Sequence, residues 1–236
     1  KPRSCLTTEP HRSGRKKNTL TLPSGQEESQ VVKLLGLWID NNYRFETHTQ
    51  KVLQKVRYKL ANLSKVRPYL SEDKAKMIVE SLIHSTINYM GILYLRLPSN
   101  QKKVQKLLNR ASRLVLKADP LTHVLDLNRE LYWLNAGNMY RFLLLTSFRR
   151  LKYGNCIAQI SWDNVFVCQP NLYKLRSVHS RVQWPKITCH GRNSYIYQST
   201  HLMNELEING ALYTSEKYFK SQMKFILWRD FYNGNL

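Results

Sequence analysis

Apolar residues recur at helical spacing through most of the chain, which predicts a mainly α-helical protein. The clearest helix spans residues 101–117, and similar spacing predicts helices over 47–66 and 71–94. Pro68 and Pro98 separate these three segments, because the residue before a proline disfavours helix. The pattern therefore predicts a three-helix bundle. The apolar face of its last helix consists of Val104, Leu107, Leu108, Ala111, Leu114 and Val115.

A short β element is predicted before this bundle. Residues 31–40 (VVKLLGLWID) are rich in strand-forming residues and end at the turn sequence Asp40-Asn41-Asn42, which indicates a strand or a pair of strands. Residues 1–30 are polar, and an isolated hairpin is marginal in water. We therefore expect residues 1–30 to be poorly ordered.

Asp119-Pro120 is a plausible boundary between the bundle and a helical C-terminal region. Residues 153–200 are less regular than the rest, with scattered Tyr, Asn, Ser and Trp. The fold class expected is thus mainly α with one small β-hairpin. Helices of the C-terminal region are predicted over 121–134, 139–151, 200–208 and 215–233.

The chain is strongly basic, with 37 Lys and Arg against 16 Asp and Glu, a net charge of +21 and a pI near 10.0. The first 120 residues carry +14 of that charge. Apolar residues (42%) and aromatic residues (11%) suffice for a core, which argues against wholesale disorder. Self-repulsion of this size favours a polyanionic partner, with nucleic acid the first candidate and an anionic membrane surface the second. A merely soluble basic protein is the third interpretation.

The positive charge is arranged in two one-sided helical rows. No acidic residue lies between Thr47 and Pro68, or between Glu80 and Asp119. Like charges at i,i+4 destabilise a free helix by a few tenths of a kcal/mol, and a phosphate backbone relieves that repulsion. The rows are therefore candidate nucleic-acid-binding residues, although solvated helix faces are the alternative. The first basic row is Lys51, Lys55 and Lys59, and the second basic row is Lys103, Lys106, Arg110, Arg113 and Lys117.

Motifs for catalysis or for metal binding do not stand out. The aspartates are dispersed, whereas two-metal phosphoryl transfer needs clustered carboxylates. Cys189-His190 lacks zinc-finger spacing, and no phosphate loop or nucleophile elbow is present. We expect no catalytic residue, metal or cofactor in this chain, and no apolar run approaches the roughly 18 residues of a membrane span. The cysteines match no disulfide framework and fit a reducing compartment: Cys5, Cys156, Cys168 and Cys189.

Several short motifs occur in order along the chain. They are KLLGLWID at 33–40, RFETH at 44–48, RPYLS at 67–71, LIHS at 82–85 with Tyr89, Gln105 with NRASRL at 109–114, and RNS, MNEL and YFK at 192–194, 203–206 and 218–220. This order resembles the C-terminal part of non-LTR (LINE-like) retrotransposon reverse transcriptases. Met203 and Glu207 depart from the family's pattern, which has Trp and Pro there.

The resemblance implies a division of the chain and a role for each part. Residues 1–45 would be the end of the palm, 46–118 a three-helix thumb, and 119–236 the region after the thumb. The turn Leu35-Gly36-Leu37 resembles the primer grip. The family's catalytic aromatic-Ala-Asp-Asp turn and its Mg²⁺ ions belong to the parent enzyme, and we expect that turn upstream of Lys1. By this resemblance, the chain would bind the template–primer duplex and would not itself catalyse polymerisation.

A second interpretation is a non-catalytic nucleic-acid-binding or interaction protein derived from a retroelement. Its helical C-terminal region would then contact a partner. A start codon close to Lys1 in the coding sequence would favour this interpretation. A third class, a basic protein of membrane surfaces, predicts binding to vesicles that nucleic acid does not displace.

Overall fold

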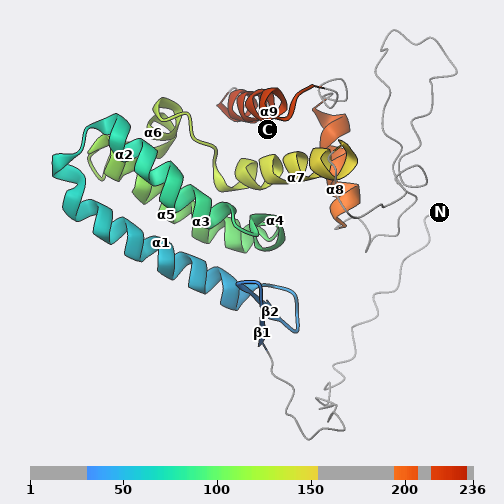
Figure 1. The fold of residues 1–236 in the computed structure, drawn as a ribbon. Coiled ribbons are helices and arrows are strands. Elements are labelled where there is room, and N and C mark those ends of the chain that lie inside the picture. Colours follow the sequence, from blue (N-terminus) through green and yellow to red (C-terminus); the bar gives the residue numbers. More distant parts are fainter. Residues whose placement is uncertain (1–30, 154–193, 207–213, 233–236) are drawn as a thin grey trace, which may run out of the picture.

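The structure is a computed structural model that describes residues 31–153, 194–206 and 214–232 (Figure 1). Within these ranges the protein is mainly α-helical with one two-stranded antiparallel sheet, which confirms the predicted fold class. The expectation of poor order for residues 1–30 lies outside the described residues.

The β element is a hairpin of two strands, β1 (Val31–Leu34) and β2 (Leu37–Asp40), with Leu34 paired to Leu37. Leu35 and Gly36 form the two-residue turn, and both have positive φ angles, 46° and 84°. Two such residues match the right-handed twist of the strands, and glycine adopts this conformation without strain. The apolar run at 31–40 is therefore a strand pair.

A parallel pair of long helices frames the bundle. These are α1 (Glu46–Val66) and α5 (Pro98–Leu116), and the 3₁₀ turn Arg67–Tyr69 follows α1. Near their first turns, Asn100 Nδ2 donates to the carbonyl of Arg44 at 3.3 Å. Near their last turns, Arg67 Nε donates to the carbonyl of Leu114 at 3.0 Å. Contacts at both matching ends fix the parallel orientation.

The middle segment returns between α1 and α5, but it is not the single helix predicted over 71–94. It consists of α2 (Glu72–Val79), the π-helical turn η2 (Glu80–His84), α3 (Ser85–Asn88) and α4 (Gly91–Tyr94).

Backbone geometry explains the break between α3 and α4. Tyr89 is extended, with ψ at 118°, and Met90 is left-handed, with φ at 51°. A side chain on Gly91 would place Cβ 2.7 Å from Leu143 Cδ1, so glycine permits the close approach of α4 to α7. The hydroxyl of Tyr94 donates to the carbonyl of Ile87 at 2.6 Å and closes the bend.

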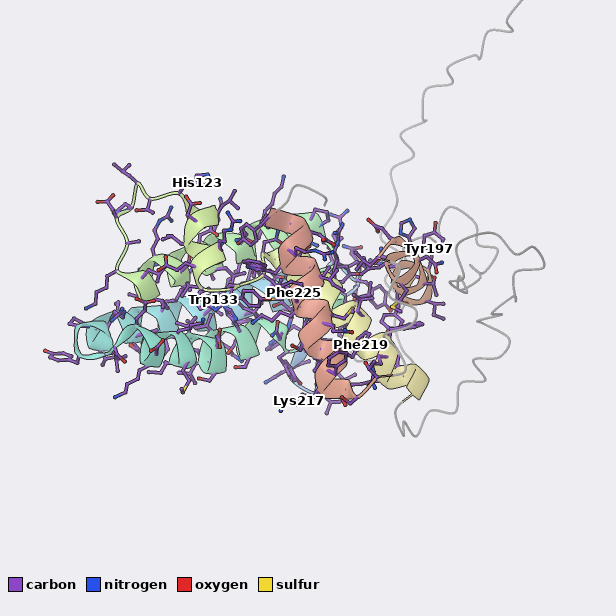
Figure 2. All side chains as sticks on the ribbon, turned by 90° about the horizontal axis from the view of Figure 1, so that it is seen from above. His123, Trp133, Tyr197, Lys217, Phe219 and Phe225 are labelled. Carbon is purple, nitrogen blue, oxygen red and sulfur yellow. The ribbon has the colours of Figure 1, made fainter. Side chains whose placement is uncertain are left out.

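The C-terminal region adds four helices to the described fold: α6 (Val124–Glu130), α7 (Ala136–Tyr153), α8 (Tyr195–Glu205) and α9 (Glu216–Tyr232). Figure 1 shows α7 extending from the bundle toward α8, and Figure 2 shows α9, with Phe219 and Phe225 along its length, crossing the helical layer.

Two hydrophobic clusters hold these parts together. The first cluster fills the bundle and also includes Leu131, Trp133 and Met139, so it continues across the boundary expected near residue 119. The second cluster lies among α7, α8 and α9 and is centred on the fully buried Phe148 and Phe219. Tyr140 on α7 packs against both clusters. Tyr140 on α7 therefore connects the cluster of the bundle with that of the C-terminal helices.

Candidate nucleic-acid interface

The first basic row follows α1 and has two different kinds of lysine. Lys51 and Lys55 are exposed. Lys59 is half-buried, and its Nζ donates to the carbonyl of Leu82 at 3.0 Å and to the hydroxyl of Thr86 at 2.6 Å. The end of this row therefore lies along the junction of α1 with η2 and α3, and Lys59 uses two of its three donors inside the protein.

The second basic row covers the outer side of α5. Lys103, Lys106 and Arg110 are exposed. Arg113 is partly buried, and its Nε has no hydrogen-bond partner among the described residues. Lys117 is exposed at the C-cap with a left-handed φ of 50°, where a cation is favoured by the helix dipole.

The two rows lie on neighbouring sides of the bundle. Lys59 places the first row beside η2, whereas the second row is flanked on its far side by Gln105, which binds the backbone of Ala136 at the start of α7. At about 100° of rotation per residue, Lys51 of the first row shares the outward side of α1 with the exposed Lys65. This side also carries Tyr58, which is 69% exposed. The structure thus gathers each row on its own helix.

The basic rows have no acidic partners in the described structure. Within the described ranges, none of the eight side chains lies within 4.0 Å of a carboxylate oxygen. The C-terminal helices differ, because Glu216 pairs with Arg150 at 2.8 Å and with Lys220 at 2.6 Å. Hydrogen bonds from those two cations lower the pKa of Glu216 to about 2. Positive charge is therefore partly neutralised on α7 and α9 but not on α1 and α5.

The hairpin turn that resembles a primer grip is attached to the bundle. Leu35 is 79% exposed at the tip, while Leu37 is buried. The hydroxyl of Tyr89 donates to the carbonyl of Leu35, and a Cβ on Gly36 would lie 3.6 Å from the same hydroxyl. Two separate sequence motifs, the turn at 35–37 and the helix ending at Tyr89, thus meet in space.

Asp40, the last residue of the hairpin motif, holds the start of α1. Its carboxylate accepts hydrogen bonds from the backbone nitrogens of Arg44 at 2.8 Å and of Glu46 at 3.0 Å. These bonds satisfy backbone donors that a helix start leaves free. Asp40 is therefore a structural residue.

The two motif histidines on the bundle are packed in its interior. His48 is 3% exposed and packs edge-to-face on Tyr94 at 5.2 Å between ring centroids. Burial, with a smaller contribution from Lys55, lowers the pKa of His48. His84 packs on Trp133 at 4.6 Å, and burial lowers the pKa of His84 to about 4. Burial therefore favours the neutral imidazole at both positions.

Metal chemistry finds no support in the part of the chain that the structure describes. There, His, Cys, Asp and Glu form no group of three or more that could hold an ion. The candidates Cys156, Cys168 and Cys189 lie outside the described ranges, as does Cys5. Of the described helices, none has both the length and the apolar character needed to cross a bilayer.

Sequence reasoning missed a row of carboxamides on the flank of α5. Gln101, Gln105 and Asn109 follow one another at i,i+4 spacing and line a hollow facing α6 and α7. Their i,i+4 spacing is the feature of the sequence that could have indicated this row. Amides are common on solvated helix faces, however, and the partners that enclose the hollow come from distant parts of the chain.

No family model matches this chain, and comparison with curated proteins and with solved structures found no similar protein.

Proposed function

We propose that this chain binds the phosphate backbone of a nucleic-acid duplex through the outer faces of α1 and α5. In this proposal it is the template–primer-binding part of a non-LTR retrotransposon reverse transcriptase, and the catalytic aspartates lie elsewhere. One observation carries the proposal: the two basic rows have no carboxylate partners within the described structure.

Electrostatics provides the driving force. Each neutralised phosphate releases condensed counterions, so affinity depends steeply on salt. Unpaired lysines and arginines repel one another in the free protein, and a polyanion removes that repulsion. Because Lys59 is bound internally, the strongest contacts come from the exposed members of the rows. These long side chains suit backbone contact, which positions a duplex without reading its sequence.

The two rows lie on different helices, which supports contact with the duplex from both α1 and α5. Tyr58 is exposed on α1 beside Lys51 and Lys55 of the first row. An exposed tyrosine between cations offers a ring for stacking and a hydroxyl for a phosphate or a 2′-OH. The anchored turn at Leu35-Gly36 is the part proposed to touch the primer end.

A salt series tests the proposal. The whole chain is titrated against a fluorescent RNA–DNA hybrid of 20 base pairs by anisotropy, between 50 and 200 mM salt. Neutralisation of about five phosphates predicts a slope of roughly −4 in log K against log salt. A slope near zero contradicts the proposal.

Matched variants locate the contact. Lys106→Gln with Arg110→Gln should weaken hybrid binding and reduce the magnitude of the slope by about 2, equally for unrelated sequences. The control, Lys74→Gln with Lys217→Gln, removes the same charge from exposed positions on α2 and α9. If both pairs lower affinity equally, the effect is one of net charge and the α5 surface is not the site.

A further inference from the structure

A cavity lined by several carboxamide side chains lies between α5, α6 and the start of α7, next to the second basic row. Its volume is about 380 Å³, and a second hollow of about 350 Å³ continues from it along α7. The two share Gln101, Asn135, Gly137 and Phe231 in their walls. Cavities of several hundred Å³ are the size that binds small organic groups. We call these two adjoining hollows together the amide pocket.

Five carboxamide side chains line the first hollow of the amide pocket, and the protein holds most of them in place. Gln105 Nε2 donates to Asn109 Oδ1 at 2.7 Å, and Gln105 Oε1 accepts from the backbone nitrogen of Ala136 at 2.7 Å. Gln101 Nε2 donates to the carbonyl of Leu95 at 2.7 Å. Fixed amides present donors and acceptors at defined positions. The five are Gln101, Gln105, Asn109, Asn128 and Asn135.

Asn128 is the least satisfied member of this set. The residue is 4% exposed, and its Oδ1 is buried with no hydrogen-bond partner among the described residues. A buried polar atom without a partner destabilises a protein, so such atoms are uncommon. Asn128 also lines the first hollow, so a ligand there that donates a hydrogen bond would satisfy this acceptor once the amide turns toward the hollow.

The remaining walls define the chemistry of the ligand. Phe231, from α9, contributes an aromatic ring to both hollows. Lys102 lines the first hollow and Arg141 the second, and among the described residues no carboxylate lines either one. Amides for hydrogen bonding, a ring for stacking and cations at both parts of the pocket fit a flat heterocycle joined to phosphate.

We infer that the amide pocket binds one unstacked nucleobase of a strand held on the second basic row. This inference rests on the proposed function. Lys102 lies one helical turn before Lys106, so a strand on the row reaches the pocket without leaving α5. The amides match the donor and acceptor edge of a base, and Phe231 supplies the stacking surface.

Hybrids with a single-nucleotide overhang test the inference. The whole chain is titrated against two RNA–DNA hybrids that differ only in whether that nucleotide carries a base or is abasic. The base should raise affinity about tenfold, as expected for one stacked and hydrogen-bonded base. Asn128→Leu keeps the side-chain size and should abolish the preference while leaving affinity for the abasic hybrid unchanged.

Further variants separate failure of this inference from failure of the proposed function. Phe231→Leu should also remove the preference, and it decides the question if Asn128→Leu does not fold by circular dichroism. Lys106→Gln with Arg110→Gln should weaken both hybrids equally. Equal affinity of the unaltered chain for the two hybrids overturns the pocket while the duplex proposal stands, whereas absence of binding to either hybrid contradicts the proposed function.

A direct titration addresses the pocket without any duplex. Saturation-transfer NMR of the whole chain with each nucleoside monophosphate should show contact to base protons that Asn128→Leu removes. Absence of base contact for all four monophosphates overturns the inference whatever the hybrids show.

Discussion

The indole of Trp133 donates a hydrogen bond of 2.8 Å from Nε1 to Oε1 of Glu80. Glu80 begins the π-helical turn η2, and His84, which ends that turn, packs on the same indole ring. One side chain from the segment between α6 and α7 therefore holds both ends of the turn. Irregular helical turns are often found at functional sites, and here the irregularity is fixed by a residue outside the bundle.

Replacement of Trp133 should destabilise the whole described fold. Trp133→Phe removes the hydrogen bond and leaves the carboxylate of Glu80 without it, which predicts a loss of about 1–3 kcal/mol in the free energy of unfolding. Trp133→Ala should cost about 3–5 kcal/mol, because it also leaves a cavity in the first cluster. Urea unfolding followed by circular dichroism measures both. Two separate transitions, with only the second one shifted, would show that the bundle does not depend on Trp133.

Stability should fall in mild acid because His84 is buried in its neutral form. Its pKa is lowered from 6.5 to about 4, so between these values the unfolded chain binds more protons than the folded one. The stabilisation is complete above pH 6.5 and is lost as the pH falls toward 4, by about 3 kcal/mol at most. The negative charge of Glu80 raises the pKa of His84 and so opposes the effect of burial, whereas the positive charge of Lys224 lowers this pKa further.

Urea midpoints measured at pH 7.5 and pH 4.5 test whether stability falls in mild acid as predicted. His84→Gln should reduce the difference between the two midpoints, since it removes the titrating group. His48, whose pKa is also lowered by burial, contributes in the same direction. A chain that is more stable at pH 4.5 than at pH 7.5 contradicts the prediction.

Arg67 should be required for the packing of α1 against α5. Its guanidinium donates to the carbonyls of Leu70 at 2.7 Å, of Leu114 at 3.0 Å and of Val115. Those of Leu114 and Val115 are carbonyls that the end of α5 leaves free, and Arg67 is buried. Arg67→Met should lower the free energy of unfolding by about 2–4 kcal/mol, as measured by urea titration. Arg57→Met, at an exposed position on α1, is the control and should change stability little.

Sequence periodicity predicted the long elements because each carries its own amphipathic signal. Helices expected over 47–66 and 101–117 are found at Glu46–Val66 and Pro98–Leu116. The break at Met90 was not predicted, because apolar residues continue through it and the close approach of Gly91 to Leu143 on α7 cannot be seen in the sequence. Periodicity describes one helix at a time, whereas this break is decided by a neighbour far along the chain.

The candidate site also combines features that residue spacing predicts with features that depend on the packing of distant segments. The one-sided rows on α1 and α5 follow from residue spacing alone, and the structure places them on the outside of the bundle. The internal bonds of Lys59 and the enclosure of Asn128 depend on the packing of several helices. Spacing therefore predicts which side chains share a face but not which ones are free to bind.

The amide of Asn128 should contribute to ligand binding and should lower the stability of the folded protein. Its buried Oδ1 has no hydrogen-bond partner in the described structure, so replacing the amide with an apolar group of similar size removes a destabilising feature. Asn128→Leu should raise the free energy of unfolding by about 1 kcal/mol, measured by urea titration, because such sites trade stability for function. The backbone carbonyl of Asn128 still accepts the bond from Trp133 N in this variant. A large loss of stability would indicate that the amide is structural.

Lys55 and Lys59 are equivalent in the sequence but should differ in their effects on binding and folding. Lys55 is exposed, whereas the ammonium of Lys59 bonds to Leu82 and Thr86. Lys55→Gln should therefore reduce the magnitude of the salt slope for hybrid binding by about 1 and leave the urea midpoint unchanged. Lys59→Gln should lower the free energy of unfolding by about 1 kcal/mol, because two hydrogen bonds are lost, and should change the salt slope less.

The salt slope should change more in Lys55→Gln, whereas the urea midpoint should change more in Lys59→Gln. Both substitutions remove one positive charge from the same row of α1, so a response to net charge alone would be equal for the two. Equal slopes and equal midpoints would mean that the internal bonds of Lys59 do not persist in solution. A larger slope change for Lys59→Gln would mean that Lys59 turns outward to the phosphate when nucleic acid binds, and that the first basic row is formed on binding.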